Sequence, residues 1–97
     1  MNDELKNELL AMKLRDEAVR SSLVDSGGLF EGYSEEMEAV HRAHAQRLAE
    51  IVQQHGWPGL SVVGQEGCEA AWLIAQHAIS QPELQKDFLR RIQDAVA

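Results

Sequence analysis

The first stretch of the chain distributes apolar and polar residues with the period of an amphipathic helix. Five apolar residues recur at spacings of three, four or seven: Leu5, Leu9, Met12, Val19 and Leu23. Residues with these spacings lie on one face of a helix. Asn2 or Asp3 can cap the helix start, and Gly27-Gly28 follows its end. The pattern predicts a helix over residues 3–25.

Two further helices have clear start signals. Ser34 is a favourable N-cap for a helix over residues 34–55. The inward side of that helix is expected to contain Met37, Val40, His44, Leu48, Ile51, Val52 and His55. Pro82 suits a first helical turn and predicts a helix over residues 82–96. The buried stripe of that last helix is expected to contain Leu84, Phe88, Ile92 and Ala95. Residues 26–33 form the expected connection between the first two helices.

The helix predicted over residues 65–79 is apolar on nearly every side, which is typical of a helix that other elements enclose. Before it, Gly56 supplies a left-handed helix end and Pro58 prevents continuation, and residues 60–64 are expected to be extended. Four helices with short links predict an all-α fold. We expect a compact, irregular four-helix bundle with a central buried helix, in a single domain spanning residues 1–97.

Charge is unevenly distributed along the chain. Ten of the 16 acidic residues but only four of the nine Lys and Arg residues occur by Glu38, and the net charge is −7. An acidic front half argues against direct nucleic-acid binding, since phosphate contacts need clustered Lys and Arg. No apolar run is long enough to cross a bilayer and the N-terminus has no signal-peptide pattern, so we predict a cytoplasmic protein without membrane contact. The single Cys68 cannot form an internal disulfide.

A carboxylate lies on the apolar stripe of the first helix. Asp16 falls between Met12 and Val19, and Arg20 follows one turn later, where it can pair with an inward charge. Asp16, His55 and His77 are the candidate set for acid–base catalysis, because imidazole titrates near neutral pH. No nucleophile accompanies them. The alternative is that His55 and His77 are simply satisfied within the fold.

The second helix also has a spacing suited to metal ligands. Glu38 and His41 are three residues apart, as are His41 and His44, so either pair projects from one face. Zinc needs three or four convergent ligands, and no other helix carries a second such motif. The expectation is therefore no cofactor, with a divalent metal held by these residues as the alternative.

Four short motifs resemble those of an uncharacterised bacterial family of small helical proteins, a domain of unknown function. They are HGWP at residues 55–58, VG at 63–64, G with AAW at 67 and 70–72, and QHA at 76–78. The resemblance includes the first helix and covers most of the chain. It implies a small helical fold without an assigned activity. Members tend to carry Asp and Asn where this chain has His41 and His44, and to continue into a C-terminal segment lacking here, so we expect a short member or a lost piece.

The incomplete catalytic set and the acidic front half predict a non-enzymatic protein-interaction module of the adaptor, inhibitor or immunity type. Its partner would be another protein, with a basic surface as one option, contacted through Glu31, Glu35, Glu36, Glu38 and Trp57. One alternative is a histidine-centred enzyme or enzyme fragment, with or without a metal. A further alternative is a homodimeric regulatory protein that pairs through Trp57 or through the edge formed by Leu10 and Leu14.

Overall fold

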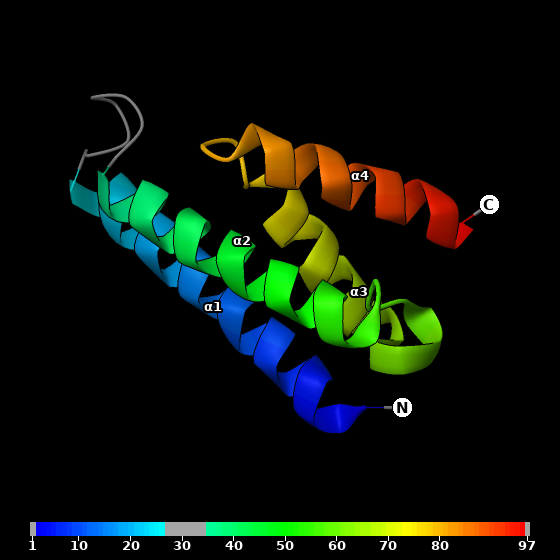
Figure 1. Cartoon of the computed structure of the whole chain (residues 1–97). Coiled ribbons are helices and arrows are strands. Elements are labelled where there is room, and N and C mark those ends of the chain that lie inside the picture. The colour runs from blue at the N-terminus through cyan, green and yellow to red at the C-terminus, as the bar shows by residue number, and fades with distance from the viewer. Residues whose placement is uncertain (1, 27–34, 97) are drawn as a thin grey trace.

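The first helix begins where the sequence places its cap. Oδ1 of Asn2 accepts a hydrogen bond from the N–H of Leu5 at 3.0 Å, which satisfies a donor that the helix start would leave unpaired. The computed structural model describes residues 2–26 and 35–96, in which α1 (Asp3–Ser26) is followed by α2 (Glu35–His55), α3 (Leu60–Gln76) and α4 (Pro82–Val96). These described residues contain no strand, and the predicted all-α four-helix fold is confirmed (Figure 1). Ser26, predicted to begin the connection, is the last residue of α1. The rest of the predicted connection, with Glu31, and the Ser34 cap lie outside the described residues.

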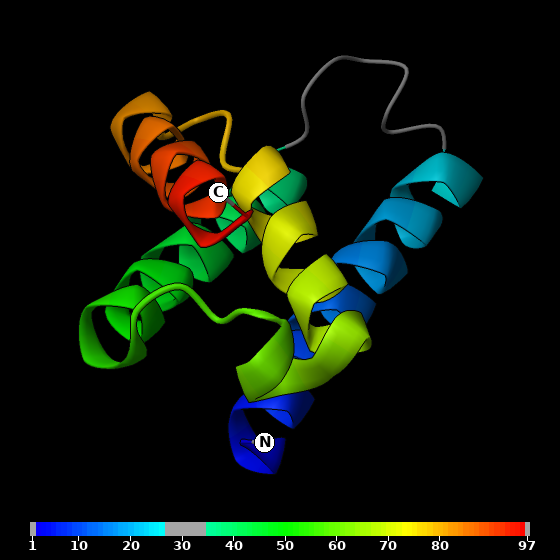
Figure 2. The same cartoon turned by 90° about the vertical axis from the view of Figure 1, so that its right-hand side faces the viewer.

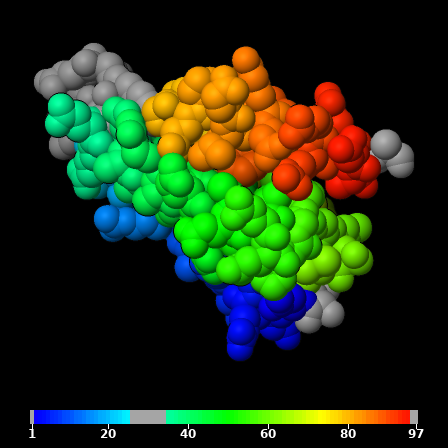
Figure 3. Space-filling view, in the orientation of Figure 1, coloured from blue at the N-terminus to red at the C-terminus, as the bar shows by residue number. Residues whose placement is uncertain are grey.

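Helices α2 and α3 each contact the other three helices, and α1 packs mainly against α3. Figure 2 shows α3 between α1 on one side and α2 and α4 on the other. Helix α2 contacts both α1 and α4, and the space-filling view shows α2 and α4 as one continuous surface (Figure 3). The hydrophobic core therefore lies around α3, where the inward faces of all four helices meet.

Most of the core consists of residues that the periodicity selects. The buried side chains that were predicted include Leu5, Leu9, Met12 and Val19 of α1, Leu48, Ile51 and Val52 of α2, and Phe88 of α4. In α3 the buried positions are mainly small residues, among them Ala70, Ala71 and Ala75. Small side chains let neighbouring helices approach α3 closely. Ala95, predicted to be buried in α4, is exposed.

The expectation that α3 is enclosed on every side is wrong in one respect. Trp72 is 47% exposed and Cys68 is half-buried. This side of α3 faces an open apolar groove of about 530 Å³ rather than another helix. The groove runs from the start of α3 to the end of α4 and is lined mainly by Trp57, Leu60, Cys68, Trp72 and Ile92. A helix that is apolar all round is thus covered on one side and open on the other.

The start of α3 also differs from the prediction. Leu60–Val63 is helical, although it was expected to be extended, and the chain then bends at Gly64. Gly64 has φ 72° and ψ 179°, a combination that essentially only glycine adopts at low cost. The main part of α3 begins after this bend, where the sequence places its start, and it ends at Gln76 rather than Ile79.

The HGWP motif ends α2 as predicted. Gly56 has φ 75°, and its N–H donates to the carbonyl oxygen of Val52 at 2.8 Å, which closes the helix with a left-handed residue. Pro58 is buried, and the Trp57 ring packs against Phe88 of α4 with ring centroids 6.3 Å apart. The motif therefore joins the end of α2 to α4 as well as turning the chain toward α3.

We expect Gly64→Ala to lower the free energy of unfolding by about 1–3 kcal/mol, because an L side chain is strained at this φ and ψ. Gly59→Ala is the matched control: Gly59 has φ −85°, and an added Cβ would meet no atom within 4 Å. The control should leave stability unchanged or raise it by up to about 1 kcal/mol. Urea unfolding curves measure both, and equal effects would contradict the strained bend.

Candidate functional site

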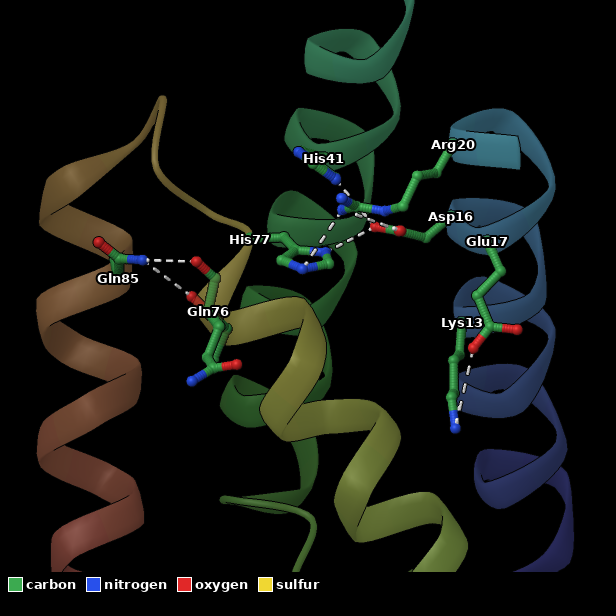
Figure 4. Close-up of polar contacts among 9 residues, drawn as sticks. Lys13, Asp16, Glu17, Arg20, His41, Gln76, His77 and Gln85 are labelled. Atoms are coloured by element: carbon green, nitrogen blue, oxygen red, sulfur yellow. Dashed lines mark hydrogen bonds and ion pairs between the residues drawn. The ribbon is translucent and has the colours of Figure 1, made fainter. Parts of the chain in front are cut away.

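Side chains from three helices meet at one carboxylate. Oδ2 of Asp16 in α1 lies 2.8 Å from Nε2 of His41 in α2 and 2.8 Å from Nδ1 of His77 at the end of α3. The two imidazole rings are 4.7 Å apart between centroids and tilted by 41°. Figure 4 shows both rings and the Arg20 side chain close to Asp16. We call Asp16, Arg20, His41 and His77 the Asp16 cluster.

Asp16, His41 and His77 are each positioned by a different helix. Asp16 lies on the buried stripe of α1, and His41 lies on the buried side of α2 one turn after Met37. His77 follows the last residue of α3, and its backbone N–H donates to the carbonyl oxygen of Leu73 at 3.0 Å. The three side chains therefore meet only when α1, α2 and α3 are packed together.

Helix α4 holds the end of α3 in place. Nε2 of Gln85 donates to the carbonyl oxygen of Gln76 at 2.9 Å and to that of Ala75 at 3.3 Å (Figure 4). The last carbonyls of a helix have no partner inside it, so these bonds satisfy groups that would otherwise need water. They fix the residues immediately before His77, and thereby the position of its ring.

The Asp16 cluster is closed on one side and open on the other. The side chains of Asp16 and His41 are each 5% exposed, whereas that of His77 is 24% and that of Arg20 is 45% exposed. His77 and Arg20 therefore form the exposed side of the cluster, while Asp16 itself is shielded from solvent.

The charge state of Asp16 follows from competing effects. Burial by itself would raise its pKa, because burial disfavours the charged form. Hydrogen bonds from His41 and His77, together with the positive charge that either ring carries when it is protonated, outweigh burial and hold the pKa of Asp16 well below its ordinary value. Arg20 adds an ion pair, with Nη2 3.6 Å from Oδ1 of Asp16. Asp16 is therefore a carboxylate at neutral pH.

The partners of His77 select its tautomer. Nδ1 lies 2.8 Å from a carboxylate oxygen, which only accepts, and Nη2 of Arg20 lies 3.5 Å from Nε2. A guanidinium only donates, so Nε2 is the acceptor and Nδ1 carries the proton. The ring thus links Asp16 to Arg20, and its Nε2 lone pair faces the open side of the cluster.

The geometry also fits a metal ion. One ligand atom each from Asp16, His41 and His77 can be chosen so that all three lie within 4.8 Å of one another. Tetrahedral ligands about 2.1 Å from zinc are about 3.4 Å apart. The two 2.8 Å contacts to Asp16 would therefore widen by about 0.6 Å, and no two of the three ligand atoms are more than 4.8 Å apart. Two imidazoles and one carboxylate are also a ligand set that zinc uses.

The structure regroups the residues predicted for chemistry. Asp16 and His77, expected in an acid–base set, lie together with His41, expected in a metal set. The prediction that His55 lies on the inward side of α2 is wrong: His55 is exposed at the helix end, about 21 Å along the helix axis from His41. Oε1 of Glu38 instead pairs with Arg42 at 2.7 Å. The prediction did not place His41 beside Asp16. The four-residue spacing between Met37 and His41 was a usable signal, because it places both residues on the same face of α2.

His44 is close to the Asp16 cluster without being part of its ligand set. It is half-buried, and burial lowers its pKa below the ordinary value. The charge of Asp16 opposes this shift, while His41 and Arg15 add to it. His44 therefore favours its neutral form in the folded protein.

Comparison with known families gives one match. Residues 3–96 match the model described as a family of unknown function, DUF6624. The chain belongs to the DUF6624 family. No curated protein and no solved structure matches this DUF6624 chain. Within the described residues of this DUF6624 protein, none of the helices has both the length and the apolar character needed to span a membrane.

We expect the free energy of unfolding to fall as the pH is lowered through about 6.5, the ordinary pKa of histidine. The pKa of His44 is lower in the folded state, so the unfolded chain binds more protons and acid favours it. His44→Gln should lose less stability between about pH 7.5 and about pH 5.5 than the natural chain. Urea unfolding in the presence of a chelator measures the free energy of unfolding at both pH values. An equal loss of stability in both proteins would contradict the lowered pKa of His44.

Proposed function

We propose that this domain binds one divalent metal ion, with zinc as the first choice, through Asp16, His41 and His77. The observation that carries the proposal is the convergence of these three side chains from three helices, with Asp16 and His41 buried and His77 partly exposed. Such a set differs from an exposed acidic patch, because two of its three members are almost fully buried.

A second feature of the cluster supports the proposal. Oδ1 of Asp16 is buried, and within the described part of the chain it has no hydrogen-bond partner, since Nη2 of Arg20 is 3.6 Å away. A buried carboxylate oxygen without a hydrogen bond is costly. A bound cation would satisfy it and would also compensate the buried negative charge.

The number of ligands indicates what kind of metal site this would be. Structural zinc sites have four protein ligands, whereas catalytic sites have three and keep the fourth position for water or substrate. Asp16, His41 and His77 supply three, and the cluster is open past His77. The geometry therefore favours the histidine-centred, metal-dependent enzyme among the functions that the sequence left open.

Metal binding is tested by removing metal with a chelator and titrating zinc into the protein by calorimetry. We expect one ion per chain. Asp16→Asn, His41→Ala and His77→Ala should each weaken binding by more than about 100-fold, since changes outside the ligand set already cost about 10–100-fold. A zinc concentration about 100 times the dissociation constant should stabilise the natural chain by about 2.7 kcal/mol.

The matched control is His55→Ala, which removes an exposed histidine on α2 outside the cluster. It should bind zinc as the natural chain does. Far-UV circular dichroism checks that the ligand variants remain helical. Absence of one-to-one binding in the natural chain, or an equal loss in His55→Ala and His77→Ala, would refute the metal site.

The predicted protein-interaction role rests on charge and remains a separate proposal. Glu35 and Glu36 are exposed in the first turn of α2, where acidic residues also favour the helix dipole. The dipole alone accounts for acids at this position. The metal proposal has the stronger support, because it rests on the convergence of side chains from three helices rather than on the charge of one helix turn.

A further inference from the structure

Arg20 occupies the mouth of the Asp16 cluster. Its guanidinium Nη2 lies 3.6 Å from Oδ1 of Asp16 and 3.5 Å from Nε2 of His77, and the side chain is 45% exposed (Figure 4). Both contacts are long for hydrogen bonds to an arginine. The guanidinium is therefore held loosely, next to the side from which a ligand would enter.

Metal binding would remove one of the two partners that hold Arg20 and would share the other with the ion. If the ion binds Nδ1 of His77, the ring proton has to sit on Nε2, which then cannot accept from Arg20. If the ion binds Nε2, it takes the same lone pair directly. In both cases Arg20 loses its acceptor on His77, and the Asp16 carboxylate is shared with the ion.

The charge of the loaded site then favours an anion. A divalent ion with one carboxylate and two neutral imidazoles carries a net charge of +1, and the released guanidinium adds a second positive charge beside it. The loaded ion has a vacant fourth position, and arginine binds two oxygens of a carboxylate or phosphate at once.

We propose that the metal-loaded protein binds an oxyanion, a carboxylate or phosphate group of its substrate, between the ion and Arg20. One oxygen would take the open coordination position and others would accept hydrogen bonds from the guanidinium. This inference rests on the proposed metal site and adds the substrate class. It also makes anion binding depend on the metal, because without the ion the site offers an anion no coordination position and places the negative Asp16 carboxylate beside Arg20.

The test uses the full chain loaded with cobalt(II), whose visible absorption reports changes in its ligands. Sodium acetate and inorganic phosphate are titrated separately as the probes. We expect a saturable spectral change with at least one of them, and the probe that binds identifies the group as carboxylate or phosphate. Calorimetry of the metal-free protein with the same probes should show no binding.

Arg20→Ala should weaken anion binding by about 10-fold or more while cobalt binding is retained, and Arg20→Lys should recover part of the loss. Arg42→Ala is the matched control, since Arg42 is an exposed arginine paired with Glu38 on α2. It should bind the anion normally.

The outcomes separate the two proposals. Cobalt binding without a response to either probe, equal anion affinity in Arg20→Ala, or binding by the metal-free protein would overturn the oxyanion site and leave the metal site standing. Failure to bind cobalt or zinc would overturn the proposed function itself.

Discussion

The burial of the Asp16 carboxylate is the constraint on which the arrangement of this molecule depends. An isolated charge in the interior is very costly, so a buried carboxylate persists only with partners that compensate it. Here the partners come from different helices: His41 from α2, His77 from the end of α3, and Arg20 from the next turn of α1. A polar interaction therefore joins α1, α2 and α3 beside the hydrophobic core that they share.

Local features at both ends of α3 accompany the position of His77. The chain bends at Gly64 before the main part of α3, and Gln85 of α4 donates hydrogen bonds to the carbonyls just before His77. Gly67 is packed closely below the bend, where an added Cβ would come within 2.6 Å of Cβ of Val63. The bend at Gly64, the close packing at Gly67 and the bonds from Gln85 all belong to the helix that ends at His77. His77 and Arg20 form the exposed side of the Asp16 cluster.

Much of the fold could be predicted because it depends on periodicity and local signals. The α1 stripe, the left-handed Gly56 and the start of α4 at Pro82 follow from spacing and from the conformations that Gly and Pro allow. The inward Asp16 and its pairing with Arg20 were also predictable, since both lie on one helix. The meeting of His41 with His77 was not, because it depends on how α2 and α3 pack. The exposure of Trp72 was missed for the same reason: periodicity identifies apolar faces but not which of them another helix covers.

The most direct measurement of the central claim is the protonation state of the His77 ring nitrogens, observed by long-range proton–nitrogen correlation NMR on the metal-free protein. Because Asp16 accepts and Arg20 donates, the account predicts a protonated Nδ1 and an unprotonated Nε2. Zinc should then change the signal of one of these nitrogens through direct coordination. A protonated Nε2 with an unprotonated Nδ1 in the metal-free protein, or the averaged pattern of a freely solvated ring, would contradict it.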